Sequence, residues 1–378
     1  MFDYEVLRVI WWGIIAAVLI GFTITDGFDM GVGILLPIIG KTNNERRIMI
    51  NSIAPHWDGN QVWLITAGAG LFAAWPMVYA TSFSGFYIAM ILVLCALFFR
   101  PLGFDYRNKL EHSKWRSLWD AGIFIGSFVP ALVFGVAFGN LLEGVPFTLD
   151  NFLRVSYEGN FFGLLNPFAI VAGVVSLMLI VTQGGAWLQL KTTGDLYLRA
   201  RKATQISALI MIIAFVIAGV WVIWGMHGYE ITSAIDYRAD ANPLTKTVTT
   251  DVSWLANYNA LPILWAVPLL GIVFPILTII LSGLNRNALV FLTSSLTIVC
   301  VLMTFGITTF PFIIPSSIMP DMSLTIWDAT SSQLTLTVMF WVVAIFLPIV
   351  LLYTIWSYIK MFGRLNKSFI EQNDHTLY

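Results

Sequence analysis

Long apolar runs alternate with short polar segments along almost the whole chain. A helix that crosses a bilayer needs roughly 20 mostly apolar residues, and nine runs of about that length follow one another. The runs are residues 9–39, 59–76, 79–99, 117–141, 161–189, 204–225, 260–283, 288–313 and 336–358. Pro76, directly after Trp75, is expected to separate the second run from the third, because proline interrupts a helix. The pattern predicts an all-α membrane protein with about nine transmembrane helices.

Basic residues are concentrated in alternate connections between these runs. Cytoplasmic loops of membrane proteins are enriched in Lys and Arg. Of the 20 basic residues, 16 follow the first, third, fifth and seventh runs or lie in the tail. This distribution predicts an odd number of spans, with the N-terminus periplasmic and the C-terminus cytoplasmic. Because no long linker or repeat divides the chain, residues 1–378 are expected to form a single polytopic membrane domain.

The composition excludes a water-soluble fold. Hydrophobic residues make up 58% of the chain and charged residues 11%, whereas soluble domains carry about 25% charged residues. A formal net charge of −1 makes nucleic acid a poor candidate partner, so lipid is the expected surrounding. The first run is too long for the core of a cleavable signal peptide and should remain as a span. Cys95 and Cys300 lie in apolar runs and are expected to be buried thiols.

Acidic residues inside the apolar runs are the most informative feature, because an Asp near a helix centre costs roughly 2.5–3.5 kcal/mol on insertion scales. Asp26 and Asp29 stand three residues apart in the first run, which places both carboxylates on one helix face. His56 and Asp58 come just before the second run, and Asp120 lies near the start of the fourth. With the predicted orientation, all five lean toward the cytoplasm. The placement predicts a proton intake path in which carboxylates and a histidine relay protons.

Each acid also has a purely structural interpretation. Asp120 follows Arg116 by four residues and could form a local ion pair, and Asp58 could cap the second helix. The arginines that could pair with the acids are Arg46, Arg47, Arg100 and Arg116. The glycines that could let a neighbouring helix approach the first one closely are Gly27, Gly31 and Gly33.

Ligands for a redox metal are scarce. Haem iron takes His, Met, Cys or Tyr as axial ligand, but only His56 lies near a predicted span. The other histidines, in loops or the tail, are His112, His227 and His375. A lone histidine is more often a hydrogen-bonded structural residue than a ligand, and no metal or haem-attachment motif is present. The sequence predicts no metal site in this chain.

Five segments spread over the chain carry a family resemblance. They are residues 25–31 (TDGFDMG), 51–64 (NSIAPHWDGNQVWL), 98–107 (FFRPLGFDYR), 310–317 (FPFIIPSS) and 324–332 (LTIWDATSS). Together they resemble subunit II, the smaller membrane subunit, of the bacterial cytochrome bd-type quinol oxidases. Because the segments run from the first helix to the last loop, the resemblance covers essentially the whole chain.

The resemblance implies a nine-helix subunit of the bacterial inner membrane that forms a heterodimer with a haem-bearing subunit I, with small accessory subunits as further candidates. Such an assembly oxidises quinol near the outer face and reduces oxygen to water, which generates a proton motive force without a pump. Two haems b and one haem d would be ligated mainly or wholly by subunit I, and this chain is a candidate to hold a bound quinone. Asp26, Asp29, Asp58 and Asp120 match acids implicated in proton entry, whereas His56 is a candidate from its location alone.

Two other functions would fit a membrane protein of this kind. A secondary transporter would also use carboxylates inside the membrane and broken helices, although no pair of matching inverted repeats is detectable. A structural scaffold would hold the same acids without any transfer of protons. Substitution of Asp26 or Asp58 distinguishes a scaffold from a relay, and co-purification of haem with a larger partner distinguishes both from a transporter.

Overall fold

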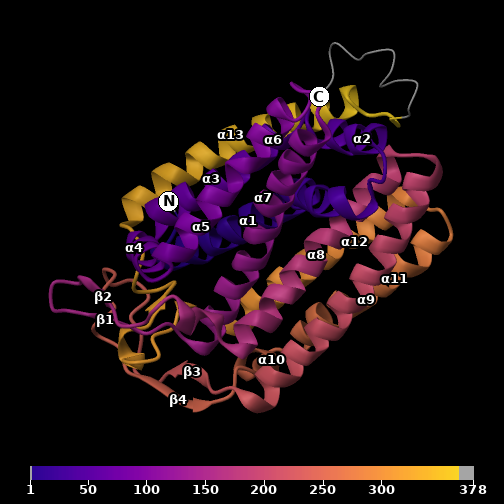
Figure 1. The fold of residues 1–378 in the computed structure, drawn as a ribbon. Coiled ribbons are helices and arrows are strands. Elements are labelled where there is room, and N and C mark those ends of the chain that lie inside the picture. Colours follow the sequence, from indigo (N-terminus) through magenta and orange to yellow (C-terminus); the bar gives the residue numbers. More distant parts are fainter. Residues whose placement is uncertain (1, 366–378) are drawn as a thin grey trace.

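The computed structural model describes residues 2–365 and is built almost entirely of helices (Figure 1). The longer helices are α1 (Tyr4–Ile39), α2 (Asn43–Ile53), α3 (Trp57–Ala74), α4 (Pro76–Gly85), α5 (Tyr87–Leu97), α6 (Phe99–Tyr106), α7 (Ser113–Glu143), α8 (Pro167–Lys191), α9 (Gly194–Gly225), α11 (Ala266–Gly283), α12 (Asn287–Thr309) and α13 (Gln333–Lys360). Short helical turns are α10 (Ala256–Ala260), η1 (Phe162–Leu165), η2 (Pro262–Trp265) and η3 (Pro320–Met322). Three antiparallel pairs of strands lie in connections: β1 (Phe147–Leu149) with β2 (Val155–Tyr157), β3 (Gly228–Ile231) with β4 (Val248–Val252), and β5 (Phe312–Ile314) with β6 (Leu324–Thr325). The tail after residue 365, which includes His375, lies outside the described residues.

Within residues 2–365, eight helical stretches are long and apolar enough to cross a membrane. They are α1, α5 with α6 (Tyr87–Tyr106), α7, α8, α9, η2 with α11 (Pro262–Gly283), α12 and α13. The predicted all-helical membrane architecture is confirmed. The ninth predicted span, residues 59–76, corresponds to helix α3, which is not among these eight. Its first turn carries polar residues. The third span lies at residues 87–106 instead of 79–99, because Pro76 begins a separate short helix, α4.

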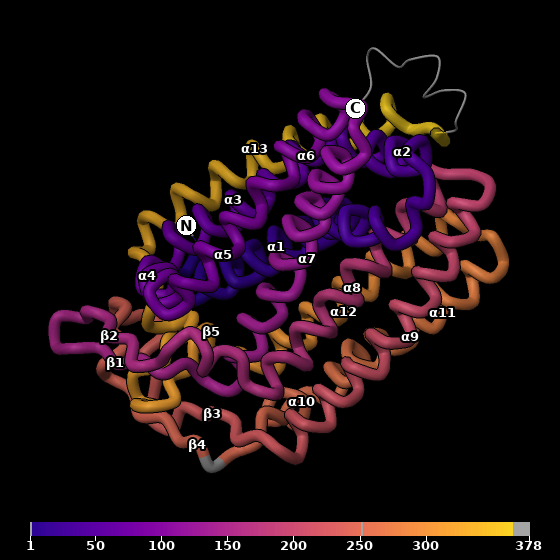
Figure 2. Tube along the Cα trace, in the orientation of Figure 1, coloured from indigo at the N-terminus to yellow at the C-terminus, as the bar shows by residue number. Residues whose placement is uncertain are grey.

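Helix α1 lies at the centre of the bundle and contacts α3, α7, α8 and α12. Figure 2 shows α9, α11 and α12 together on one side of the molecule, with α3, α5 and α13 on the other. The three strand pairs lie at one end, called here the hairpin end, and α2 lies at the opposite end, called here the α2 end (Figure 1). Helices α1 and α13 both start at the hairpin end, where the Tyr4 hydroxyl donates to the carbonyl of Ser331. Which end faces the cytoplasm stays a prediction from the distribution of basic residues.

Helices α1 and α8 touch through their backbones. A Cβ atom on Gly31 would lie 2.8 Å from Cα of Gly184 and would collide with the carbonyl oxygen of Ile180. A Cβ atom on Gly33 would lie 2.9 Å from Cβ of Ser127 on α7. Gly27, in contrast, leaves ordinary van der Waals space of 3.8 Å. The predicted close approach is therefore confirmed at Gly31 and Gly33 and wrong at Gly27.

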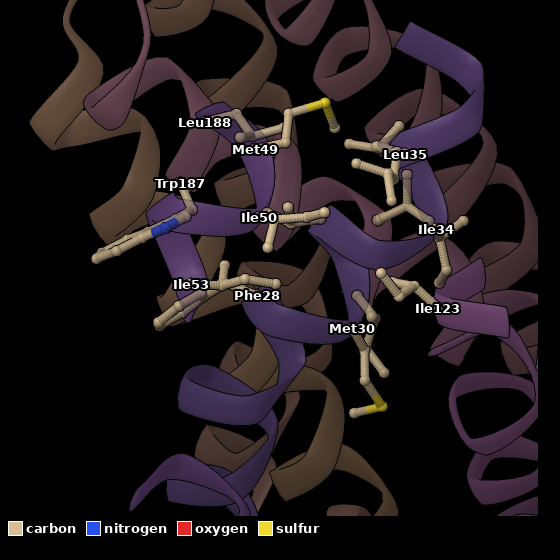
Figure 3. Close-up of a cluster of buried hydrophobic side chains, with 14 of the residues drawn as sticks. Phe28, Met30, Ile34, Leu35, Met49, Ile50, Ile53, Ile123, Trp187 and Leu188 are labelled. Atoms are coloured by element: carbon tan, nitrogen blue, oxygen red, sulfur yellow. The ribbon is translucent and has the colours of Figure 1, made fainter. Parts of the chain in front are cut away.

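The apolar core near the α2 end joins α1, α2, α7 and α8. In Figure 3, Phe28, Ile53 and Trp187 gather on one side of this cluster, and Ile34 and Ile123 lie on the other. The rings of Phe28 and Trp187 are stacked with centroids 4.1 Å apart. This packing fixes the half of α1 that carries its two acids.

One of the two predicted buried thiols is exposed. Cys300 is buried between helices, but Cys95 on α5 lies on the surface of the chain. An apolar run in a membrane protein can face lipid or a partner as readily as a core, so hydrophobicity alone does not predict burial there.

The connections at the hairpin end are tied to the start of α1. Arg8 is 1% exposed, and its guanidinium donates to the carbonyls of Tyr237 and Ala239 at 3.0 Å and to Oγ1 of Thr330 at 3.2 Å. Lys246 and Asp328 form an ion pair of 2.9 Å between two of the loops. The loop after α12 is thus held in place at this end by Arg8 and Lys246.

Candidate functional site: buried carboxyls near the α2 end

Asp26 is neutralised by an arginine from another helix. Its side chain is fully buried, and both of its oxygens accept hydrogen bonds from the Arg100 guanidinium, at 2.6 and 3.0 Å. Arg100 lies on α6, inside the third span, and is 1% exposed. Paired groups of this kind can be held away from water because each satisfies the other's charge. The possible partnership of Arg100 with these acids, noted from the sequence, is confirmed for Asp26.

Asp29 has no such partner. It is also fully buried, one turn after Asp26, and its Oδ2 accepts a hydrogen bond of 2.8 Å from the Asn60 amide on α3. Its Oδ1 has no hydrogen-bond partner, and neither has Nε of Arg100. Buried polar atoms normally find a protein or water partner, so these two atoms mark a place where ordered water would fit.

The charges of this group do not balance. Two carboxyls, those of Asp26 and Asp29, share the neighbourhood of one guanidinium, that of Arg100. Unpaired charge is costly in an apolar interior. The set is electrically neutral only when one carboxyl carries a proton, and Asp29 is the carboxyl whose oxygens are not both occupied. The arrangement can therefore hold or release one proton.

The amide oxygen of Asn60, which faces away from Asp29, is bound by a residue of α13. The Tyr358 hydroxyl on α13 donates to Oδ1 of Asn60 at 2.6 Å. The Tyr358 ring is stacked on the imidazole of His56, with centroids 4.2 Å apart and planes inclined by 11°. His56 lies in the turn before α3, where burial, assisted by the charge of Lys191, lowers its pKa to about 4. The imidazole is therefore neutral at neutral pH.

Asp120 belongs to a different cluster. Its Oδ1 accepts from Nε of Arg107 at 2.5 Å, and its Oδ2 accepts from Arg107 at 3.2 Å and from Arg46 on α2 at 2.7 Å. The local pair with Arg116 suggested by the sequence spacing does not form. Asp120 pairs instead with Arg107, directly after α6, and with Arg46 on α2. Both segments lie against the start of α7.

Asp58 stands apart from the buried carboxyls. It is exposed in the first turn of α3, and the residue at the cap position of that helix is His56, whose side chain makes no capping bond. The expected capping role of Asp58 is therefore wrong. Of the five predicted site residues, the structure brings Asp26 and Asp29 together and connects His56 to them only through Tyr358 and Asn60, whereas Asp58 and Asp120 lie apart.

Sequence reasoning missed three residues that complete these clusters. Asn60 donates to Asp29, Tyr358 donates to Asn60, and Arg107 donates to Asp120. The only signal available for Asn60 was an amide at the start of a membrane helix, and for Tyr358 a hydroxyl near the end of the last apolar run. Neither signal names its partner.

The described residues form no cluster of metal ligands. Between residues 2 and 365, no group of three or more His, Cys, Asp or Glu side chains could hold a metal ion. His56 is the one buried histidine in that range, and one face of its ring is covered by Tyr358.

Comparison with known proteins decides the family. The sequence profile of cytochrome bd terminal oxidase subunit II matches residues 7–361. The chain belongs to this family. Cytochrome bd-I ubiquinol oxidase subunit 2 of Escherichia coli (strain K12) is 61% identical to it over 379 residues, which cover 100% of both chains. A probable cytochrome oxidase subunit 2 of Haemophilus influenzae is 56% identical over the same full length. The resemblance seen in the motifs is confirmed.

A solved structure shows the same fold. A chain from the structure of bd oxidase from Geobacillus thermodenitrificans matches this subunit II with a TM-score of 0.68. The match covers 95% of this chain and 100% of that one at 14% sequence identity. At this identity the likeness concerns the fold alone. The family assignment favours an oxidase subunit over the transporter alternative.

Proposed function

We propose that this subunit II works in a bacterial inner membrane as part of a ubiquinol oxidase of the respiratory chain, paired with a haem-bearing subunit I. Full-length identity of 61% to cytochrome bd-I ubiquinol oxidase subunit 2 of Escherichia coli supports this assignment. Haems b and d, held mainly by subunit I, would supply electron transfer and oxygen reduction. A bound quinone and accessory subunits stay predictions.

We further propose that Asp29 takes up protons from the cytoplasm for the reduction of oxygen to water. The observation that carries this proposal is a fully buried carboxyl with one hydrogen bond, one unpartnered oxygen and no cation of its own. Ionisable groups inside membranes are functional by default, because their insertion is costly. A carboxyl locked on both oxygens, as Asp26 is by Arg100, has less freedom to exchange a proton.

The other acids take supporting roles in this proposal. Arg100 and Asp26 hold a fixed positive and negative charge beside Asp29, which keeps the neighbourhood polar. Asp58, exposed at the start of α3, is placed to collect protons at the surface two residues before Asn60. Asp120 is occupied by Arg107 and Arg46 and serves to hold α2, the α6 loop and α7 together.

Asp29→Asn tests the proton role, because an amide keeps the shape of the side chain but cannot carry a proton. We expect oxygen consumption by the purified complex to fall roughly a hundredfold, the scale of losing one proton-transfer group. Haem content and co-purification with the larger subunit should stay normal. The matched control is Asp195→Asn, an exposed acid at the start of α9 near the same end of the molecule. A variant Asp29→Asn that assembles and turns over like the control would reject the relay and leave the scaffold interpretation.

A further inference from the structure

We propose that Tyr358 is a positioning residue for Asp29 that acts through the amide of Asn60. The proposal rests on the proton role of Asp29 and adds the last helix to that site. Its basis is a chain of two hydrogen bonds that joins three helices: Tyr358 of α13 to Asn60 of α3 at 2.6 Å, and Asn60 to Asp29 of α1 at 2.8 Å.

The direction of these bonds gives the chain its function. Oδ1 of an asparagine only accepts and Nδ2 only donates, whereas a tyrosine hydroxyl can do either. With the Tyr358 hydroxyl donating to Oδ1, the amide of Asn60 presents Nδ2 to Asp29, which suits an ionised carboxyl. If the amide turned over, Oδ1 would face Asp29 and could accept a hydrogen bond from its protonated form, and the hydroxyl would then accept from Nδ2. Tyr358 can therefore hold the Asn60 amide in the orientation that suits either the ionised or the protonated carboxyl of Asp29.

The Tyr358 ring is held in place on several sides, so the hydroxyl has a defined position. His56 stacks on one face, while Phe28 and Trp187 contact the ring edge-on at centroid distances of 6.3 and 6.1 Å. The neutral state of His56 at neutral pH means that this stack adds no charge beside Asp29.

Helix α13 has few other attachments to the chain. Its buried residues are Leu336 and Thr337 near the hairpin end, where the Trp11 indole donates to the Leu336 carbonyl at 3.0 Å. Near the α2 end, Tyr358 bonds to Asn60, and the segment directly after the helix is held by Lys191, whose ammonium donates to the Met361 carbonyl at 3.0 Å. The Tyr358 hydroxyl thus links the position of α13 to the hydrogen bonding of Asp29 through Asn60.

Tyr358→Phe in the purified two-subunit complex removes that hydroxyl and keeps the ring. We expect kcat of ubiquinol-driven oxygen consumption to fall about tenfold, which corresponds to the loss of one hydrogen bond near a charged group, with KM for a short-chain ubiquinol unchanged. The infrared band of the Asp29 carboxyl, identified by its loss in Asp29→Asn, should shift. Tyr353→Phe, an exposed tyrosine of the same helix, should change neither quantity.

Asn60→Ala is the second variant, because it breaks the same chain from α3 and should reproduce both effects even if Tyr358→Phe assembles poorly. If both variants keep wild-type kcat and an unshifted band while Asp29→Asn stops turnover, the positioning role is wrong and the proton role of Asp29 stands. If Asp29→Asn itself turns over normally, the proposed function fails, and a shifted band in Tyr358→Phe would then report a structural contact only.

Discussion

His56 shows how one buried residue can make the subunit sensitive to acid. Its imidazole is 6% exposed and lies between the turn before α3 and the Tyr358 ring. Burial lowers its pKa from the ordinary value of 6.5 to about 4, and the charge of Lys191 acts in the same direction. At neutral pH the residue is therefore uncharged, and any part it takes in proton transfer must use the neutral ring.

The lowered pKa of His56 predicts a loss of stability in acid. Between pH 6.5 and about 4 the unfolded chain binds a proton on this residue and the folded chain does not, so the free energy of unfolding falls as pH falls through that range. We expect His56→Phe, which keeps an aromatic ring against Tyr358, to lose less stability than the wild type. Thermal unfolding of the detergent-solubilised complex at about pH 7 and about pH 5 measures the difference. The exposed residue His112 provides the control, since His112→Phe should follow the wild type. Equal losses in all three proteins would contradict the assignment.

At the residue scale, the sequence indicated the acids and two of their partners, Arg46 and Arg100, but not Asn60, Tyr358 or Arg107. Asp26 and Asp29 stand out because charge inside an apolar run is rare and costly. The group that completes the Asp29 site, Tyr358, is 298 positions away from Asn60 in the chain, and no local spacing rule reaches that far. The distribution of basic residues predicts a loop position for Arg100, but the structure buries it in the third span.

At the element scale, the crossing of α1 and α8 is fixed by glycine. A Cβ atom on Gly184 would lie 2.5 Å from Cα of Gly31 and 2.5 Å from the backbone nitrogen of Val32. Small residues at such contacts let membrane helices pack backbone to backbone. Van der Waals contacts then hold the helices together, because the hydrophobic effect does not act between helices in lipid. Both acids of α1, Asp26 and Asp29, lie just before this level of the helix, so their positions depend on the contact.

Gly184→Ala should therefore separate the two helices and lower the free energy of unfolding by about 1–3 kcal/mol, the usual cost of overpacking. Denaturant unfolding of the complex in mild detergent gives the value. Gly219→Ala on α9 is the matched control, because nothing lies within 4 Å of its added methyl group. A stability of Gly184→Ala no lower than that of the control would show that the bundle can relax around the methyl group.

Helix positions were predictable where apolarity and length coincide, and less so where proline or polar residues intervene. The prediction for residues 204–225 missed the first turns of α9, which begin at Gly194 and carry charged residues. The third span moved to residues 87–106 because Pro76 starts α4, and α4 ends at Gly85 before the next helix begins. Such breaks depend on how neighbouring elements pack, which hydropathy does not report.

At the scale of the whole molecule, Arg8 joins three parts of the chain at the hairpin end. It is buried on α1, is stacked on the Tyr4 ring at 3.6 Å, and donates to the loop at Tyr237 and Ala239 and to Thr330. Its charge is satisfied by carbonyl and hydroxyl oxygens instead of a carboxylate. This one side chain therefore holds the connection between α9 and η2 against the first and last spans.

Arg8→Met should release that connection without opening the bundle. We expect proteinase K to cut between β3 and β4 several-fold faster in the variant, since the cleavage rate follows the population of locally opened states. Arg238→Met, an exposed arginine in the same loop, should leave the rate unchanged. Fragment masses identify the cut. An unchanged rate in Arg8→Met would mean that the Lys246–Asp328 pair suffices to hold the loop.

The place of Tyr358 in the last described helix has a consequence for biogenesis. A ribosome makes α1 first and α13 after every other described span, so Asp29 enters the membrane long before the hydroxyl that completes its hydrogen-bond chain. Until then the amide of Asn60 has no fixed orientation and the carboxyl no ordered connection toward the α2 end. Under the proposed proton role of Asp29, a half-synthesised subunit therefore lacks the hydrogen-bond chain that completes the inlet.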